Sequence, residues 1–261
     1  MRSKAPRFPP RLWQCQVRGA ILTLGFWLAG VDFVTAAETI TAARYTEPTT
    51  RYTHGVLGDD IEYGALEITV ESIDPKKLQK TPRNPAVLTI RLPQDRVFED
   101  LAPRLADIDL DGSNEVIVVE TSVHEGAQLA IYNARGDKIA ATPHIGARNR
   151  WLAPAGIWDL DNDGHIEIAY IDRPHLAKTL RIWRYKDREL SEIATLPGLT
   201  NHQIGDAFIA GGLRYCTTGP KLILASADWS RIISVSYNGG WQTTDLGPLK
   251  HRRDLTSAPN C

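Results

Sequence analysis

The sequence predicts an all-β fold, built as a small β-propeller or a propeller-like repeat array of about four units. Three observations support this: two segments repeat with the same order of loop and strands, short apolar runs alternate with turns, and the 261 residues include 20 Gly and 16 Pro. A period of ~50 residues with several strands in each unit is typical of propeller blades. One blade cannot bury its own faces, so neighbouring units must stack.

The clearest repeat covers residues 105–119 and 157–171, where an acidic loop leads into an apolar strand. The second strand of each unit follows at nearly the same spacing, over 129–132 and 180–183. Fainter copies lie on both sides of this pair. The four expected units lie near residues 45–98, 99–149, 150–199 and 200–247.

Four units are at the low end of the ~4–8 blades that propellers usually have. The units can close into a ring, remain an open arc or close by association, and the same strands can also pack as a β-sandwich. We expect the ring to close.

The first 37 residues have the pattern of a secretory signal peptide. Five basic residues precede the apolar run 20–30, and small residues follow up to Ala37. The run is shorter than the ~20 apolar residues that a membrane-spanning helix needs; an uncleaved anchor is the alternative. We expect a secreted or periplasmic protein without a stable membrane span after cleavage. The expected segments are a signal peptide over 1–37, a linker over 38–50, the repeat domain over 51–247 and a C-terminal tail over 248–261.

Two cysteines remain after cleavage, Cys216 and Cys261. In an oxidising compartment an even number suggests one disulfide, and two free thiols are the alternative. Without residues 1–37 the chain carries 25 Lys+Arg and 30 Asp+Glu, a formal charge of −5. This balance gives no reason to expect a nucleic-acid partner.

The first acidic loop (residues 107–115) and the second acidic loop (residues 159–167) carry carboxylates at alternate positions and then a glycine. In a tight loop such side chains can turn toward one point, and glycine permits the sharp turn. Hard oxygen ligands in this number suit Ca²⁺, which takes 6–8 oxygens. Without a cation the crowded carboxylates would repel one another. The predicted ligands are Asp107, Asp109, Asp111, the Ser113 carbonyl and Glu115 for one ion, and Asp159, Asp161, Asp163, the His165 carbonyl and Glu167 for the other.

These loops differ from an EF-hand, which needs a bidentate Glu at its twelfth position and a helix on each side. The twelfth positions here are Val118 and Tyr170, and the flanking residues are β-branched and apolar without helical spacing. We therefore expect calcium loops in a strand setting, closed by the Glu at the ninth position. The alternative is an Asp-rich turn that binds no ion.

Both acidic loops resemble the loops of FG-GAP/VCBS repeat proteins, and integrin α-subunit propellers carry similar loops. The resemblance implies β-propeller blades with Ca²⁺ bound between adjacent strands of a blade. It covers residues 99–199, and the outer units follow only by analogy. The Phe-Gly…Gly-Ala-Pro pattern is not intact, with a trace at 153–156. Family propellers often have seven blades, so four units depart from that pattern.

The sequence therefore predicts an exported calcium-binding repeat protein that acts as a non-catalytic binding or adhesion scaffold. We expect about two structural Ca²⁺ ions and a protein or carbohydrate partner. The alternative is a secreted carbohydrate-active enzyme built on a propeller scaffold. Neither a Gly-x-Ser-x-Gly elbow nor a P-loop occurs. For the enzyme, the candidate acids and bases are Asp59, Asp60, Glu62 and Asp206, and no spacing rule selects a pair among them.

Two histidines and several tryptophans have both a functional and a packing interpretation. His54 and His202 occupy similar repeat positions, so they could face a shared central pocket, although such histidines more often serve packing. Exposed tryptophans could stack on sugars. Aromatic residues are favourable in strands, however, so we expect these tryptophans to lie in the hydrophobic cores of the blades. The tryptophans in question are Trp151, Trp158, Trp183, Trp229 and Trp241.

Overall fold

The computed structural model describes residues 37–74, 79–80 and 85–255. The predicted signal peptide lies outside these residues, apart from Ala37, and so does Cys261, so the disulfide with Cys216 stays a prediction. Within the described ranges no helix is long and apolar enough to cross a membrane.

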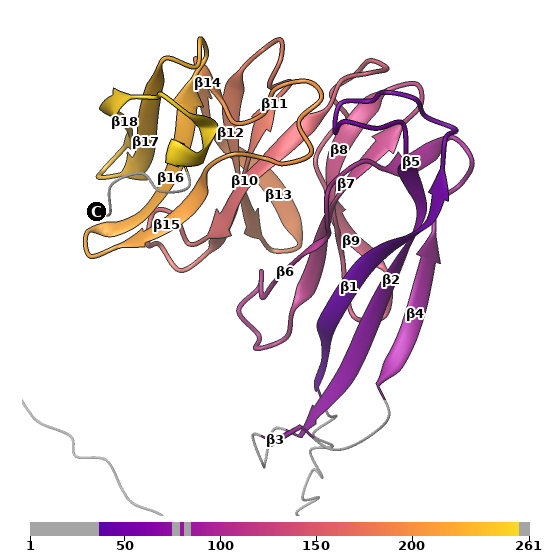
Figure 1. Ribbon diagram of the computed structural model, residues 1–261. Coiled ribbons are helices and arrows are strands. Elements are labelled where there is room, and N and C mark those ends of the chain that lie inside the picture. Colours follow the sequence, from indigo (N-terminus) through magenta and orange to yellow (C-terminus); the bar gives the residue numbers. More distant parts are fainter. Residues whose placement is uncertain (1–36, 75–78, 81–84, 256–261) are drawn as a thin grey trace, which may run out of the picture. The chain divides into compact units, whose positions relative to one another are not determined.

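The described chain forms three antiparallel sheets (Figure 1). The first contains β1 (Ala37–Thr49), β2 (Glu62–Asp74), β3 (Gln79–Lys80), β4 (Ala86–Arg91), β5 (Arg96–Phe98), β6 (Arg104–Ala106), β7 (Glu115–Ser122), β8 (Gly126–Tyr132) and β9 (Lys138–Ala141). The second contains β10 (Leu152–Trp158), β11 (Ile166–Asp172), β12 (Thr179–Lys186) and β13 (Glu189–Pro197). The third contains β14 (Leu199–Thr200), β15 (Gly212–Cys216), β16 (Gly219–Ser226), β17 (Arg231–Tyr237) and β18 (Trp241–Pro248).

Three of the four predicted units correspond to four-stranded meanders: β6 to β9, β10 to β13, and β15 to β18. In the second and third meanders the second strand is the most buried, and in the first meander the second and third strands are both fully buried. All residues of β7 and β11 are buried, whereas β9 and β13 are largely exposed or half-buried. A strand buried on both faces needs a continuous apolar run, which these two strands have. The all-β, propeller-like fold is therefore confirmed.

The first predicted unit is built differently from the others. β1 and β2 form a long antiparallel pair, and β5 pairs with both β2 and β7, so this unit shares one sheet with the second unit. Residues 38–50, which we expected to be a linker, form β1 instead. The reason is burial: Ile40 is fully buried and packs in one core with Leu66 and Ile68 of β2.

The main hydrophobic core lies between the sheets. It joins Ile117 of β7, Leu152 of β10, Ile168 of β11 and Leu222 of β16. In the predicted C-terminal tail, the 3₁₀ helix η1 (Arg252–Leu255) places its last residue in a smaller core under the third sheet. Between the second and third sheets, β10 contacts β15 and β16.

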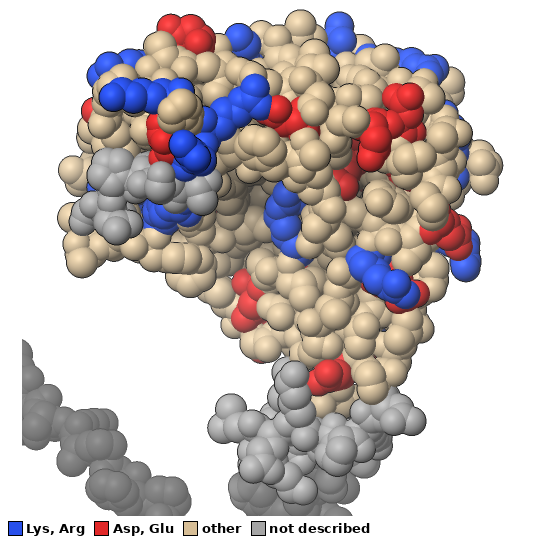
Figure 2. Space-filling model, in the orientation of Figure 1, with Lys and Arg blue, Asp and Glu red and all other residues tan. Residues whose placement is uncertain are grey.

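The tryptophans divide between core and surface. Trp151 and Trp183 are buried, as expected, and Trp229 and Trp241 are half-buried. Trp158 differs from the expectation, because 44% of it is exposed at the end of β10. Figure 2 shows the face seen in Figure 1 as hollowed in its middle, where β6, β10 and β15 meet, with acidic side chains over the β6–β7 loop.

Candidate metal centre

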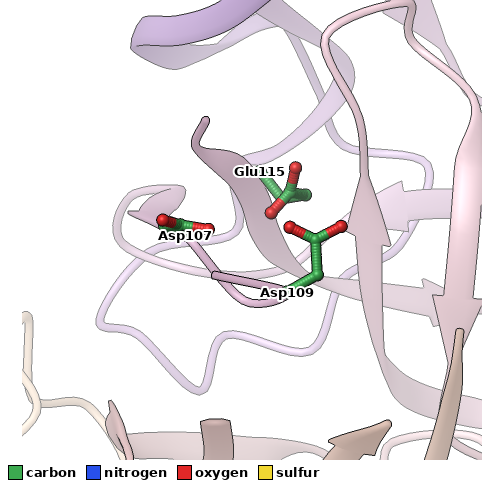
Figure 3. Close-up of side chains that lie close together, drawn as sticks. All are labelled: Asp107, Asp109 and Glu115. Atoms are coloured by element: carbon green, nitrogen blue, oxygen red, sulfur yellow. The ribbon is translucent and has the colours of Figure 1, made fainter. Parts of the chain in front are cut away.

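The first acidic loop joins β6 to β7. Ala106, the last residue of β6, lies opposite Glu115, the first residue of β7, so the antiparallel register brings the two ends of the loop together. Ligand atoms of Asp107, Asp109 and Glu115 lie within 4.8 Å of one another. Figure 3 shows the three carboxyl groups gathered around one space between the loop and the start of β7.

The loop is held by hydrogen bonds from its own amides to its carboxylates. Asp111 N and Gly112 N donate to the two carboxylate oxygens of Asp107 at 3.0 and 2.9 Å. Ile108 N donates to Glu115 Oε2 at 3.2 Å. Leu110 and Gly112 adopt positive φ angles of 60° and 91°, which wrap the loop back on itself. The carboxylates are therefore fixed by the backbone before any ion binds.

The second acidic loop joins β10 to β11 and repeats this pattern. Asp163 N and Gly164 N donate to Asp159 at 3.0 Å each, and Leu160 N donates to Glu167 Oε2 at 2.8 Å. Asn162 has a positive φ of 59°, like Leu110 at the equivalent position of the first loop. Ligand atoms of Asp159, Asp161 and Glu167 also lie within 4.8 Å of one another.

The structure brings together six of the ten predicted ligand residues as two triads. The other four lie in the same loops but outside the triads. In the first loop Asp111 accepts a hydrogen bond from Ser113 N at 2.8 Å, and in the second Asp163 accepts one from His165 N at 3.0 Å. These two carboxylates therefore stabilise the turns of their loops.

In the first loop the carboxylates face one another without a neutralising side chain. Burial and the nearby Asp109 raise the pKa of Glu115 to about 7, even though Ile108 N donates to it. Burial and Asp111 raise the pKa of Asp109. Within the described part of the chain, no Lys, Arg or His forms an ion pair with a carboxylate of this loop. Such crowding favours a bound cation.

In the second loop Arg184 of β12 supplies a positive charge. Its Nε donates to Glu167 Oε1 at 2.8 Å, its Nη1 lies 3.0 Å from Asp163 Oδ2, and it also pairs with Asp161. Burial raises the pKa of Glu167, and Arg184 opposes that shift. Asp161 Oδ1 is buried and has no hydrogen-bond partner among the described residues. One acceptor therefore remains unsatisfied beside the arginine.

Arg184 was not predicted from the sequence, although the pairing of β11 with β12 accounts for its position. Arg184 lies opposite Glu167 in the β11–β12 pair. In the preceding repeat, continuing the β7–β8 register one residue beyond the Val116–Tyr132 pair puts Asn133 opposite Glu115. The two loops thus differ in charge through a residue on the neighbouring strand.

The donor set fits a hard cation. Both triads contain only carboxylates, with no Cys and no imidazole among the triad residues. Oxygen ligands suit Ca²⁺ and Mg²⁺, whereas thiolate and imidazole ligands favour Zn²⁺ and Cu²⁺. A loop of this irregular geometry suits the flexible coordination of Ca²⁺ better than the strict octahedron of Mg²⁺.

A second group of ionisable residues lies at the opposite ends of the same strands. His54 Nδ1 is 2.5 Å from Glu99 Oε1, and Thr121 Oγ1 donates to Glu99 Oε2 at 2.6 Å. Trp151, which precedes β10, donates its indole N–H to the Glu99 carbonyl at 2.8 Å. Burial raises the pKa of Glu99. His54 is therefore held by a buried carboxyl group rather than by packing alone.

His202 lies on the other side of Trp151, with the ring centroids 4.9 Å apart. Its Nε2 is 2.9 Å from the Asp206 carbonyl, and its Nδ1 is 3.0 Å from His175 Nε2. Because a carbonyl only accepts, His202 Nε2 carries the proton and its Nδ1 accepts from His175. Burial lowers the pKa of both histidines, to about 4 for His175.

The acids that we considered for catalysis differ in their surroundings. Asp59 and Asp60 are exposed, and Asp206 pairs with Arg252. Glu62 is buried, and burial together with Glu99 raises its pKa. The sequence did not indicate Glu99 or His175, since neither belongs to a repeated motif.

The comparisons with known proteins give distant matches only. No protein-family model matches the chain. No curated protein matches it either. A rhamnogalacturonan lyase PL11 from Bacillus licheniformis is 14% identical over 69% of this chain and 42% of that chain, with a TM-score of 0.38. A luciferin-regenerating enzyme is 13% identical over 81% and 80% of the two chains, with a TM-score of 0.34.

A chain in the structure of the Mitotic Checkpoint Complex is 12% identical over 72% of this chain and 48% of that chain, with a TM-score of 0.33. This chain thus spans less than half the length of the lyase and of the checkpoint chain. At TM-scores this low the matches assign no family, substrate or activity.

Proposed function

We propose that this chain is an exported repeat protein of the FG-GAP/VCBS type, stabilised by Ca²⁺, which acts as a non-catalytic binding scaffold. One observation carries the proposal. Two acidic triads stand at the same place in successive repeats, and each is held by the same amide-to-carboxylate hydrogen bonds. A chance cluster of surface acids has no reason to repeat in this way.

The proposed role of the ion is structural. A cation bound by Asp107, Asp109 and Glu115 ties the end of β6 to the start of β7 and removes the repulsion among these carboxylates. Extracellular calcium modules typically bind at ~10⁻⁴–10⁻³ M, which suits a secreted or periplasmic protein. An ion that binds only the folded state stabilises it by mass action.

Thermal melts with and without Ca²⁺ test this proposal. We expect millimolar Ca²⁺ to raise the melting temperature of the chelator-stripped protein by roughly 2–8 °C, since ~1–2 kcal/mol of binding free energy corresponds to such a shift for a chain of this size. The variant D109A combined with D161A should lose the increase. D137N, which changes an exposed acid in the β8–β9 turn, is the matched control and should keep it. An unchanged melt for the wild type would contradict the proposal.

A second candidate function, a carbohydrate-active enzyme, is favoured by the pair formed by His54 and the buried Glu99. A buried carboxyl group with a raised pKa beside an imidazole is a common arrangement at acid–base sites, and burial raises the pKa of Glu99. Screening a panel of polysaccharides for cleavage products tests it. Cleavage that is abolished in H54Q, with an unchanged melting temperature, would replace the scaffold by the enzyme. The absence of any cleavage supports the scaffold.

A further inference from the structure

A cavity of about 700 Å³ opens between the two acidic loops. Its volume is within the ~300–1,000 Å³ of typical small-molecule sites. The walls come from all three sheets, because residues near the ends of β6, β10 and β15 line the cavity. Six lining residues matter for its chemistry: Asp107, Asn114, Trp158, Asp159, Asn162 and Tyr215.

An exposed aromatic pair forms one wall. Trp158 at the end of β10 and Tyr215 in β15 meet edge to face, with ring centroids 4.7 Å apart and an interplanar angle of 78°. Yet 44% of Trp158 and 66% of Tyr215 are exposed. Large aromatic side chains contribute most to the stability of a fold when they are buried. Two aromatic side chains that stay exposed in the same cavity therefore indicate a binding surface for a ligand.

The backbone brings these rings together through a close approach of the second and third sheets. Gly156 of β10 has no side chain, and a Cβ there would lie 2.6 Å from Leu222 and 3.3 Å from Leu213. A Cβ at this position would force the end of the Leu222 side chain to move and would crowd Leu213 of β15. A glycine two residues before the tryptophan thus permits the close packing of β10 against the third sheet.

The polar part of the cavity consists of fixed acceptors and amides. Both oxygens of Asp107 and both of Asp159 already accept loop amides, so these carboxylates keep one orientation. Asn114 and Asn162 add side-chain amides. None of the described residues that line the cavity is Lys or Arg, so an anionic ligand would find no partner there.

We propose that this cavity binds a neutral oligosaccharide. A pyranose ring offers an apolar C–H face, which packs on an exposed aromatic ring, and a rim of hydroxyl groups, which bond to amides and carboxylates. Acidic sugars are disfavoured because none of the described residues that line the cavity is Lys or Arg. Cationic ligands lose their attraction once Ca²⁺ neutralises the loops. The inference rests on the proposed scaffold function and gives that scaffold a ligand class and a position.

The test is calorimetric titration of cellohexaose, xylohexaose and mannohexaose into the Ca²⁺-loaded protein, together with tryptophan fluorescence. We expect at least one of these sugars to bind. W158A and Y215A should each weaken binding at least about tenfold, as expected for a central aromatic contact. W158F should retain most of the affinity because it keeps an aromatic face. The control W241A changes a tryptophan that pairs with Tyr237 in the β17–β18 hairpin, outside the cavity, and should bind like the wild type.

Three results would overturn the inference. The first is no binding of any of the three sugars, and the second is binding that W158A and Y215A leave unchanged. The third is tighter binding of tetramethylammonium or of trigalacturonate than of every neutral sugar, which would assign the cavity to cations or to acidic sugars. Ca²⁺ binding is measured on the same samples. Calcium binding without sugar binding would reject this inference alone, and sugar binding without calcium binding would reject only the calcium part of the proposed function.

Discussion

The first and second acidic loops use the same amide-to-carboxylate hydrogen bonds, but among the described residues a cation reaches only the second. Arg184 lies against three carboxylates of the second loop, whereas the first loop faces Asn133 at the corresponding register position. A shared sequence motif therefore sets the geometry of both loops without setting their charge. The neighbouring strand determines how strongly each loop needs a metal ion.

This difference predicts two unequal calcium sites. The first loop has unopposed carboxylates and should bind Ca²⁺ more tightly. The second loop retains a buried, unpartnered oxygen on Asp161, so it should still accept Ca²⁺, but the arginine already compensates part of its charge.

The largest expected effect is that of R184A. Removing one partner of a largely buried ion pair leaves uncompensated charge, which costs about 3 kcal/mol. We expect urea unfolding of the calcium-free variant to show a loss of about that size, and Ca²⁺ to restore more stability than it adds to the wild type. The matched control is R231A, which breaks an exposed pair with Asp245 and should cost much less stability than R184A. Equal losses for the two variants would show that Arg184 does not neutralise the second loop.

A smaller effect is expected from the reverse exchange, N133R, which offers the first loop the cation that it lacks. We expect the affinity of the first loop for Ca²⁺ to fall about tenfold, because the introduced arginine then replaces about 1.4 kcal/mol of the attraction between the loop and the ion. Calcium titration measures the change. N133Q is the control, since Asn133 also accepts amides of the β8–β9 turn and that loss must be separated from the charge. If N133R and N133Q bind Ca²⁺ equally well, the register argument fails.

The smallest effect concerns the ends of the strands that lie away from the loops. The folded-state pKa of His175 is lowered to about 4 by burial and by His202. A lowered histidine pKa means that the unfolded state binds protons more readily between pH ~6.5 and ~4, so stability is present above that window and is lost as the pH falls through it. We expect H175Q to lose about 1 kcal/mol less free energy of unfolding than the wild type between pH 7 and 4. The effect is no larger because the ring is half-buried and solvent weakens the shift.

Urea unfolding at several pH values from 7 to 4 measures this slope. H124Q, which changes a histidine in the β7–β8 turn with no resolved role in the cluster, is the control and should keep the wild-type slope. A wild-type slope in H175Q would contradict the assignment of a neutral, half-buried His175.

Local pattern was sufficient to predict the repeats and the loops, because alternating carboxylates, a glycine and a following apolar run are contiguous in the chain. It was not sufficient for Arg184, Glu99 or His175, whose roles come from pairing between strands distant in sequence. The expected linker became β1 because Ile40 completes a core that forms only when β2 is present. Trp158 was expected in the core, but its place at the end of a strand leaves it exposed.

The most direct test is calorimetric titration of Ca²⁺ into the chelator-stripped wild-type protein. We predict two sites whose affinities differ by about tenfold or more, with the tighter site lost in D109A and the weaker site lost in D161A. Two sites of equal affinity would contradict the difference between the loops, and no binding at millimolar Ca²⁺ would contradict a calcium role for either of them.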